Sequence, residues 1–231
     1  MLQAHTHIDS IFRIDAVQGE LRTRSMVCIA GNETTKTIHK EYGVSIHVDV
    51  DKVYFTPRLA TERRYIASLV KPDEIILDMF AGVAPFPLII SRFSKPKHII
   101  AVDKNKTAIK LARKNIVLNK ISTTVELYHE DACNIPELIR QKNVFPDRII
   151  MNLPFHAHAF FPTALQCIEK KAVIHFYTIG SEDSINKLLD ELKIVGKNNG
   201  FYCSIGKKRT IKSYSPHEFY MGIDITAKKI S

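Results

Sequence analysis

Residues 148–155 of the sequence read RIIMNLPF, an apolar run that ends on an amide, a proline and an aromatic ring. The side chain of Asn152 offers one hydrogen-bond acceptor and two donors, and such a group can read the edge of a nucleobase. Pro154 stiffens the turn, and Phe155 is placed to stack on a planar ring. The simpler interpretation is a strand cap and a turn, so the rest of the chain must decide between a turn and a base-binding pocket.

Acidic residues follow three other strand-like runs. Asp78 ends the first run, Asp103 ends the second, and Glu130-Asp131 follows the third. Ligands of an open parallel sheet bind at the carboxyl ends of the strands, where an acid after the second strand typically binds ribose hydroxyls. An acid after the third can receive an adenine amino group. Each acid alone is more often a helix cap or a surface charge, but three at successive strand ends predict a cofactor site, and S-adenosylmethionine fits it best.

The loop DMFAGVAPF (78–86) joins the first strand to the next helix. Its small residues let backbone amides approach a ligand. Gly82 is its only glycine, so the loop is not the G-x-G-x-x-G of dinucleotide enzymes. We therefore expect it to bind a zwitterionic amino acid rather than cradle a phosphate.

The elements that must position these residues alternate along most of the chain. Short apolar strands and amphipathic helices follow each other after Pro57, and two strand-like runs close the chain without a helix between them. We expect strands at 74–79, 98–102, 124–128, 148–151, 172–178, 201–211 and 218–226, and helices at 58–70, 85–93, 107–119, 135–141, 157–168 and 182–195. This order predicts an α/β fold with a doubly wound, mostly parallel sheet and an antiparallel hairpin at one edge. It matches the Rossmann-like fold of class I S-adenosylmethionine-dependent methyltransferases, which is weak evidence of function by itself.

A small β-rich unit precedes this sheet. The runs 12–14, 26–29 and 45–53 alternate or are apolar, and glycines punctuate them. We interpret them as a small antiparallel unit. We therefore divide the chain into a β-rich domain at 1–56, which contributes to the active site, and a Rossmann-like domain at 57–231.

The composition limits the class of protein. The chain has 231 residues, of which 45% are hydrophobic, and no apolar run approaches the roughly 18 residues of a membrane span. The start of the chain does not read as a signal peptide, and four scattered cysteines form no CxxC pair. We expect a cytoplasmic monomer without a metal. The net charge of +9 suits a polyanion such as a phosphate backbone, although a basic cluster such as 207–212 is as often a solvated face.

Residues from about 11 to 227 resemble the archaeal and eukaryotic tRNA (guanine-37 N1)-methyltransferases. The resemblance rests on GELRTR (19–24), TIHKEYGVSIHVDVDKVYFTPRLATER (37–63), DMFAGVAPF (78–86), AVDKNKTAIKLARKNIVLNKI (101–121), RIIMNLP (148–154) and KSYSPHEFYMGIDI (212–225). It implies methyl transfer from S-adenosylmethionine to N1 of guanosine 37, beside the anticodon, with the tRNA anticodon loop as partner.

The resemblance also assigns residues to the site. It implies catalytic roles for Arg22, Glu62, Asn152 and Pro154, and contact with the substrate for Tyr54, Arg58 and Phe155. The implied cofactor-binding residues are Asp78, Phe80, Ala81, Gly82, Val83, Asp103, Lys104, Asp131, Ala132 and Asn152. In this assignment, Glu62 removes the N1 proton, while Arg22 and Asn152 stabilise the negative charge that builds on O6. Read alone, Arg22 and Glu62 would be ordinary surface charges.

The sequence departs from the family in three places. Members usually begin with a further domain that grips the outer corner of the tRNA, and we expect this chain to lack it. Phe155-His156 stands where Lys-Ser is common, and Ala84 replaces a glycine. The choice of tRNA species is therefore open.

Other activities remain as alternatives. Sister enzymes of wyosine synthesis methylate a tricyclic guanosine derivative or transfer an aminocarboxypropyl group, although the latter typically lack the asparagine motif. Amino-group methyltransferases share the NLPF pattern, so a different RNA-base N-methyltransferase is another reading. A non-catalytic RNA-binding module is disfavoured because every expected site residue is present.

Overall fold

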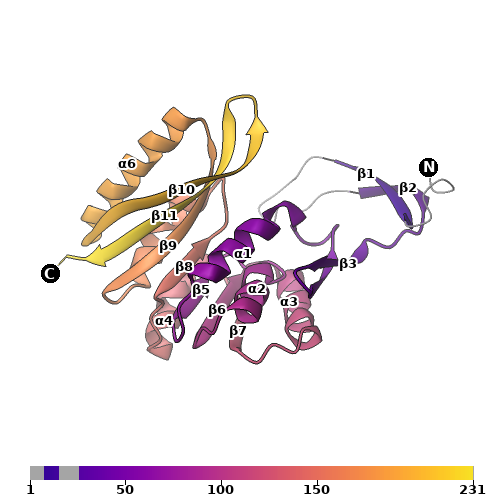
Figure 1. Ribbon diagram of the computed structural model, residues 1–231, viewed down its shortest axis with the longest axis horizontal. Helices are drawn as coiled ribbons and strands as arrows, with labels where there is room; N and C mark the ends of the chain where they lie inside the picture. The colour runs from indigo at the N-terminus through magenta and orange to yellow at the C-terminus, as the bar shows by residue number, and fades with distance from the viewer. Residues whose placement is uncertain (1–7, 16–25, 231) are drawn as a thin grey trace.

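A seven-stranded sheet forms the centre of the computed structural model, which describes residues 8–15 and 26–230 (Figure 1). Its strands are β5 (Ile75–Asp78), β6 (His98–Asp103), β7 (Thr124–His129), β8 (Arg148–Met151), β9 (Lys171–Gly180), β10 (Phe201–Ser215) and β11 (Glu218–Lys229). Their order is β10-β11-β9-β8-β5-β6-β7. The strands from β9 to β7 pair in parallel, whereas β11 pairs antiparallel with both β9 and β10. The predicted doubly wound sheet with an antiparallel hairpin at one edge is confirmed.

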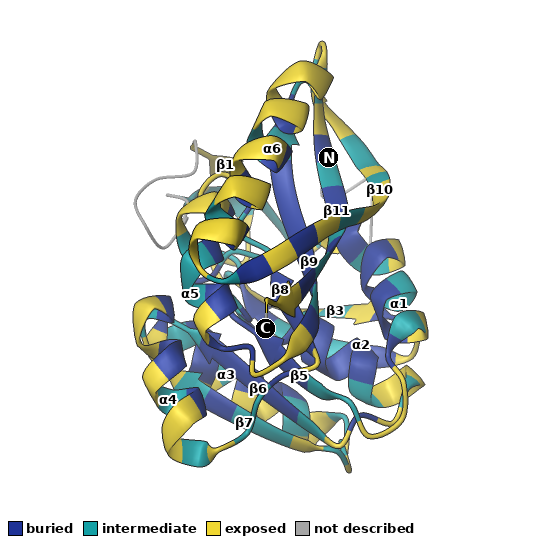
Figure 2. Ribbon diagram, turned by 90° about the vertical axis from the view of Figure 1, so that its left-hand side faces the viewer, coloured by how far each residue is buried: buried dark blue, intermediate teal, exposed yellow. Residues whose placement is uncertain are grey.

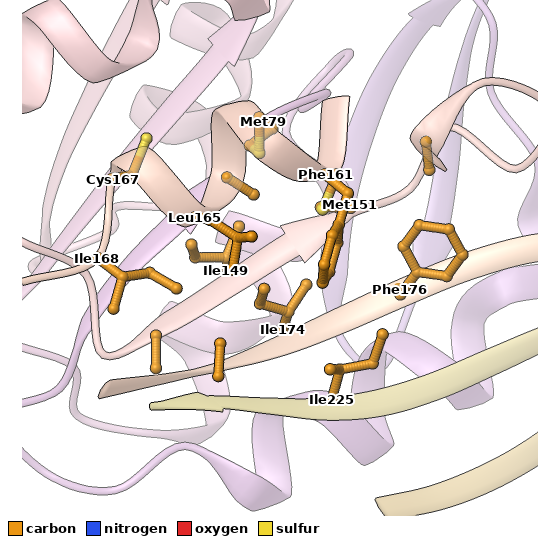
Figure 3. Close-up of a cluster of buried hydrophobic side chains, with 14 of the residues drawn as sticks. Met79, Ile149, Met151, Phe161, Leu165, Cys167, Ile168, Ile174, Phe176 and Ile225 are labelled. Carbon is orange, nitrogen blue, oxygen red and sulfur yellow. The ribbon is translucent and has the colours of Figure 1, made fainter. Parts of the chain in front are cut away.

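Helices cover both faces of this sheet, because its strands are apolar on both sides (Figure 2). The helices are α1 (Ala60–Leu69), α2 (Pro85–Phe93), α3 (Lys106–Leu118), α4 (Ile135–Lys142), α5 (Phe161–Gln166) and α6 (Glu182–Asn198), with short 3-10 helices η2 (Pro57–Leu59), η3 (Ala132–Asn134) and η4 (Ala157–Phe160). Side chains alternate along each strand, so Ile76 packs in a cluster with α1 and α2, and Leu77 packs in a cluster with α4, α5 and α6. Figure 3 shows the second cluster, in which Phe161 lies edge-on to Phe176.

Two small antiparallel hairpins precede the central sheet. In the first, β1 (Ser10–Ile14) pairs with β2 (Met26–Gly31), and in the second, β3 (Lys36–Glu41) pairs with β4 (Val44–Asp49). The strand β3 was not predicted, because its sequence KTIHKE is almost entirely polar and exposed. Buried residues of β4 share a core cluster with α1 and α2. The division of the chain at residue 56 stays a prediction.

Two asparagines hold the backbone of β4: Asn115 lies in α3, and Asn119 caps its C-terminal end. The backbone N–H and carbonyl of His47 bond to the side-chain amide of Asn115 at 2.7 and 3.2 Å, and those of Ser45 bond to Asn119 at 2.9 and 2.7 Å. The pairs match because residues four apart on a helix and two apart on a strand share a face. We call Asn115 and Asn119 the amide clamp.

Most predicted bounds agree with the structure to within a few residues, and the exceptions have local causes. The helix expected at 157–168 is split into η4 and α5, because Pro162 lacks an N–H group and restricts the residue before it. The last two strands extend beyond their predicted ends, to Ser215 and Lys229, which the sequence did not predict because the added residues are mostly polar and show no alternation of apolar side chains. Within the described part of the chain, no helix is long and apolar enough to cross a membrane.

Candidate functional site

A cavity of about 440 Å³ opens at the carboxyl ends of the parallel strands. Its walls come from the loops after β5, β6, β7 and β8 and from the segment that leads into α1. Of the residues predicted from the sequence, those that line it are Tyr54, Phe80, Ala81, Gly82, Val83, Asp103, Lys104, Asp131, Ala132 and Asn152. The volume is that of a pocket for one small molecule.

The loop after β5 forms one wall of the cavity. The backbone N–H of Gly82 donates to Asp103 at 2.7 Å, and its φ is +56°. A side-chain carbon added to Gly82 would meet only the carbonyl of Tyr54, at 3.8 Å, because the residue faces open space in the cavity. Ala84 has a left-handed φ of +65°, which strains any residue with a side chain and explains why a glycine would suit this position.

Asp103 lies at the end of β6 and faces the cavity. Its two carboxylate oxygens accept the backbone N–H groups of Gly82 and Asn105, both at 2.7 Å. Burial raises the pKa of Asp103, against the opposing effect of these two hydrogen bonds. Each oxygen keeps a second lone pair, so the carboxylate can still accept a hydrogen bond from a ligand hydroxyl.

Asp131 is the member of the Glu130-Asp131 pair that lines the cavity. It caps η3 by accepting the N–H of Cys133 at 2.9 Å, and its carboxylate lies 3.1 Å from Nζ of Lys104. These two contacts, with the backbone hydrogen bond the larger, lower the pKa of Asp131. Glu130 instead bonds to the backbone of Asp131 and to Asn134.

Asp78 lies behind the loop and is not part of the cavity lining. It is 1% exposed, and one of its oxygens has no hydrogen-bond partner among the described residues. Burial raises its pKa to about 8, although a hydrogen bond from the backbone of Phe80 acts in the opposite direction. Burial therefore favours the protonated form of this side chain at neutral pH.

Asn152 lines the cavity at the end of β8. Its side-chain oxygen accepts a hydrogen bond from the hydroxyl of Tyr220, which leaves the two amide N–H groups as donors. Pro154 is buried and lies outside the lining. Phe155 is 42% exposed and packs edge-on against Tyr214, with 5.7 Å between the ring centroids.

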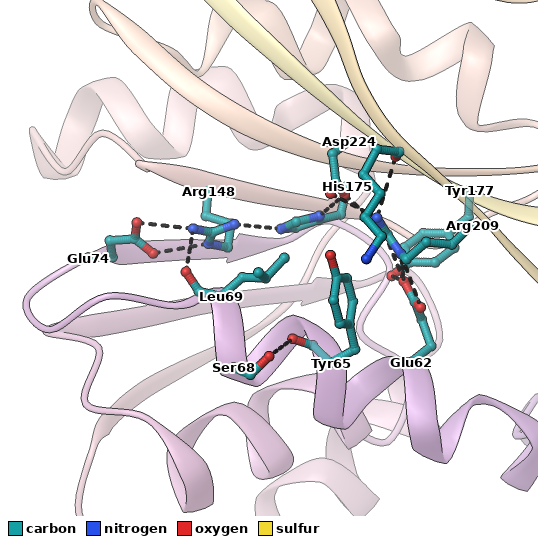
Figure 4. A network of polar contacts seen from close by, with 11 residues as sticks. Glu62, Tyr65, Ser68, Leu69, Glu74, Arg148, His175, Tyr177, Arg209 and Asp224 are labelled. Atoms are coloured by element: carbon teal, nitrogen blue, oxygen red, sulfur yellow. Dashed lines mark hydrogen bonds and ion pairs between the residues drawn. The ribbon is translucent and has the colours of Figure 1, made fainter.

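Glu62 is 7% exposed and lies outside the cavity lining, in a network of polar contacts between α1 and the C-terminal strands (Figure 4). Its Oε1 accepts the hydroxyl of Tyr177 at 2.9 Å and Arg209 Nη2 at 3.0 Å. Arg209 Nε reaches Oε1 and Oε2 at 3.2 and 3.3 Å. Gly222 lies close beneath, since an added side-chain carbon would come within 3.0 Å of Oε1 of Glu62.

The network continues from Arg209 across the sheet. Its guanidinium donates to both oxygens of Asp224, at 2.8 and 2.9 Å, and Asp224 also lies 2.7 Å from Nδ1 of His175. Nε2 of His175 lies 2.7 Å from Arg148, which in turn pairs with Glu74 at 3.0 Å. An arginine can only donate, so Nε2 accepts and the proton of His175 sits on Nδ1, facing Asp224.

The charge states in this network follow from its contacts. Burial lowers the pKa of His175 and keeps the ring neutral. Burial would raise the pKa of Asp224, but hydrogen bonds from His175 and Arg209 bring it down to about 2. Burial would likewise lower the pKa of Arg209, but Asp224 and Glu62 hold it above its usual range. Burial raises the pKa of Tyr177 well above its usual value, so the hydroxyl donates.

Sequence reasoning missed several of these residues. Arg209 was seen only as part of the basic cluster at 207–212, because nothing in the local sequence relates it to Glu62, 147 residues away. Arg63 was missed as well: it is 1% exposed, lines the cavity, and pairs with Glu41 of β3 through two hydrogen bonds of 2.6 and 2.7 Å. Arg58 is exposed on η2, and Arg22 lies outside the described residues.

No group of three or more histidine, cysteine, aspartate or glutamate side chains that could hold a metal ion is found within residues 8–15 and 26–230.

Residues 37–204 match the model of the TRM5/TYW2 methyltransferase domain. The tRNA (guanine(37)-N(1))-methyltransferase Trm5b of Pyrococcus abyssi is 36% identical over 97% of this chain and 66% of its own length. The Trm5b of Methanocaldococcus jannaschii is 40% identical over 94% of this chain and 60% of its own length. The chain thus spans about two thirds or less of the length of these curated relatives.

Solved structures agree with these relatives. The crystal structure of Trm5b from Pyrococcus abyssi covers 98% of this chain, with 66% of that protein matched, 36% identity and a TM-score of 0.85. A complex of aTrm5 with tRNALeu covers 100% of this chain and 63% of that one, at 38% identity and a TM-score of 0.82. TYW2 of M. jannaschii, solved with AdoMet, is 29% identical over 89% of this chain and 91% of its own, with a TM-score of 0.77.

Proposed function

Because the chain belongs to the TRM5/TYW2 methyltransferase domain family, we propose that it transfers a methyl group to N1 of guanosine 37 of tRNA, with S-adenosylmethionine as the cofactor. The observation that carries the proposal is the position of Asn152, whose side chain faces the same cavity as Asp103 and Asp131. A donor amide at the rim of a cofactor-sized cavity is what a base methyltransferase needs.

The residues of the cavity fit this cofactor. Gly82 leaves open space where a side chain would otherwise intrude, and Asp103 keeps acceptor capacity for the ribose hydroxyls. Asp131 is placed to receive the adenine amino group, and Phe80, Ala81, Val83 and Ala132 complete the wall. When bound, S-adenosylmethionine supplies an electrophilic methyl group on its sulfonium, a reaction that needs no metal.

Guanine N1 carries a proton and is a poor nucleophile, so a base must remove that proton as the methyl group arrives. We assign this role to Glu62, whose carboxylate is held in a fixed orientation by Arg209 and Tyr177. Negative charge then builds on O6. The free N–H groups of Asn152 can donate to it, and Arg22 is the second donor in this proposal.

The surroundings of Asn152 favour a flipped nucleotide. Tyr54 lines the cavity, and Phe155 and Tyr214 expose aromatic surface beside it. Enzymes that act on a base inside a stack extrude the target nucleotide into a pocket. We propose that the anticodon loop lies across this rim with guanosine 37 turned inward, that Arg58 contacts the RNA backbone, and that the buried Pro154 fixes the turn behind Asn152.

A second activity has an observation in its favour. An aminocarboxypropyltransferase of M. jannaschii that acts on 4-demethylwyosine is 30% identical over 93% of this chain and 84% of its own length. Such a reaction uses the same cofactor but moves a different group. The experiment below therefore follows both groups.

We would incubate the protein with tRNA transcripts that carry guanosine or adenosine at position 37, and with tRNA that carries the tricyclic base 4-demethylwyosine there, using S-adenosylmethionine labelled on either the methyl or the carboxyl group. We expect methyl label on the guanosine transcript only. We expect Glu62→Gln to slow the transfer by about 10²-fold or more, the usual contribution of a general base. Glu191→Gln, at an exposed glutamate of α6, is the matched control and should keep the wild-type rate.

Any other pattern of label would indicate a different activity or a different role for Glu62. Methyl label on the adenosine transcript would identify an amino-group methyltransferase. Carboxyl label on RNA, or label only on RNA with the tricyclic base, would identify a wyosine enzyme. A wild-type rate in Glu62→Gln, with wild-type affinity for the cofactor, would remove Glu62 from the role of base.

A further inference from the structure

The contacts of Glu62 distinguish its two oxygens. Oε1 accepts Tyr177 Oη and two nitrogens of Arg209, which fills its hydrogen-bonding capacity. Oε2 accepts only Arg209 Nε, at 3.3 Å, among the contacts of the described residues. The guanidinium of Arg209 therefore fixes the plane of the carboxylate. Oε2 is the oxygen that keeps a lone pair available to accept another hydrogen bond or a proton.

Arg209 is itself held on its other side. Its two terminal nitrogens donate to the two oxygens of Asp224, a planar pairing that fixes the guanidinium in one orientation. Asp224 also accepts the proton on Nδ1 of neutral His175, and the ring of Tyr65 lies 4.6 Å from the guanidinium. With these contacts in place, Arg209 has little freedom to turn, and neither does the carboxylate of Glu62.

The charges of the network do not cancel. Its carboxylates are those of Glu62, Asp224 and Glu74, and its permanent cations are Arg209 and Arg148. Three carboxylates against two guanidinium groups leave one excess negative charge in a buried site, while Lys207 lies at the edge, over the ring of Tyr65.

We infer that Arg209 is a positioning residue of the reaction, which acts with Asp224 and His175 to present Oε2 of Glu62 to the N1 proton of the target base. The inference rests on the proposed function, since it needs Glu62 to be the base. It goes further by naming the accepting oxygen and three residues that the sequence did not connect with the chemistry.

A double-mutant cycle tests whether Arg209 acts through Glu62. We would measure single-turnover rates for Glu62→Gln, Arg209→Gln and the double variant. A misplaced catalytic group typically slows a reaction by about 10²-fold, so we expect a loss of that size in Arg209→Gln. If Arg209 works through Glu62, the double variant should be no more than about threefold slower than Glu62→Gln alone. Losses that multiply in the double variant would show an independent or merely structural role and overturn the inference.

A second variant disturbs the geometry and keeps every charge. In Gly222→Ala, the added carbon comes within 3.0 Å of Glu62 Oε1 and 3.2 Å of Arg209 Nη2, so the pair must shift. We expect a slower transfer with unchanged affinity for the cofactor. Arg140→Gln, which removes an exposed arginine of α4, is the control and should keep the wild-type rate.

A spectroscopic readout needs no turnover. The Nε–Hε signal of Arg209 in a ¹H–¹⁵N spectrum, assigned by its loss in Arg209→Lys, should move in both Glu62→Gln and Asp224→Asn. A signal that is insensitive to both changes would overturn the inference. A wild-type rate in Arg209→Gln would overturn it and leave the proposed function standing, whereas a wild-type protein that transfers no label would remove the proposed function first.

Discussion

Asp78 and Asp224 show how strongly surroundings decide the state of a carboxyl group. Asp78 is buried without an oppositely charged partner among the described residues, and burial raises its pKa to about 8. Asp224 is also withdrawn from water, but hydrogen bonds from His175 and Arg209 bring its pKa to about 2. The two aspartates therefore differ by one proton at neutral pH, and only Asp224 takes part in an ion pair.

Asp78 makes the stability of the protein depend on pH. Its carboxyl group has an ordinary pKa of 3.8 when unfolded and about 8 when folded, so between these values only the folded state holds the proton. Its contribution is complete at low pH and is lost as the pH rises through about 8. We expect the free energy of unfolding of the cofactor-free protein to fall by on the order of a few kcal/mol between about pH 5 and pH 9.

Asp78→Asn tests this, because asparagine imitates the protonated acid. Urea unfolding followed by circular dichroism, repeated at several pH values, should show that the free energy of unfolding falls less steeply with pH in the variant than in the wild type. Asp103, whose pKa burial also raises, would cause the part of the decline that remains. Asp183→Asn, at an exposed position of α6, should decline like the wild type. Equal slopes in Asp78→Asn and the wild type would contradict the assignment.

At the scale of elements, the amide clamp attaches the β3–β4 hairpin to helix α3. Asn115 is fully buried and bonds to the backbone of His47 and to the carbonyl of Val83. Asn115→Ala would leave these backbone groups unpaired in a buried site. We therefore expect it to lower the free energy of unfolding by about 2–4 kcal/mol.

Chemical denaturation measures that loss, and Asn186→Ala provides the comparison. Asn186 is exposed on α6 and accepts one hydrogen bond from Lys208, so its removal should change the stability by no more than about 0.5 kcal/mol. Hydrogen exchange should also show faster opening of β4 in Asn115→Ala. If both variants were equally stable, the clamp would not be what holds the hairpin.

The β10–β11 hairpin offers a matched pair of tyrosines for a test of RNA binding. Tyr214 is 50% exposed beside Phe155 near the cavity, and Tyr202 is 68% exposed near the other end of β10. Stacking of one base on an aromatic ring is worth about 1–3 kcal/mol. We expect Tyr214→Ala to weaken binding of the anticodon stem-loop by about tenfold, and Tyr202→Ala to leave it unchanged.

Fluorescence anisotropy with a labelled stem-loop would measure both dissociation constants, and cofactor binding would be measured in parallel. Equal effects of the two substitutions would mean that the rim of the cavity is not where the RNA lies. A loss of cofactor affinity in Tyr214→Ala would mean that the hairpin shapes the cavity instead.

At the scale of the whole molecule, the sheet was predictable because its signals are local. The strands β5 and β8 contain short apolar runs, and each run stops at a polar residue: Asp78 at the end of β5 and Asn152 directly after β8. The acids at the strand ends were predictable for the same reason, since topology alone brings the ends of parallel strands together. Asp103 and Asp131 both line the cavity, and their roles there stay a prediction.

Contacts between distant segments were not predictable. Two examples are the ion pairs of Glu41 with Arg63 and of Glu62 with Arg209. Nothing in the local sequence around either glutamate indicates which arginine it pairs with. The strand β3 escaped notice because an exposed strand need not alternate. The sequence also assigned Glu62 to the site without showing that its side chain lies outside the cavity lining, against the C-terminal hairpin.

The separation of 147 residues between Glu62 and Arg209 bears on how the protein is made. A ribosome releases α1 long before it adds β10 and β11, so during synthesis the glutamate exists for some time without the arginine that orients it. The residues that line the cavity end at Phe160, so all of them precede the last hairpin in the chain. Until the last hairpin is added, a nascent chain therefore lacks the contacts that hold the carboxylate of Glu62 in one orientation.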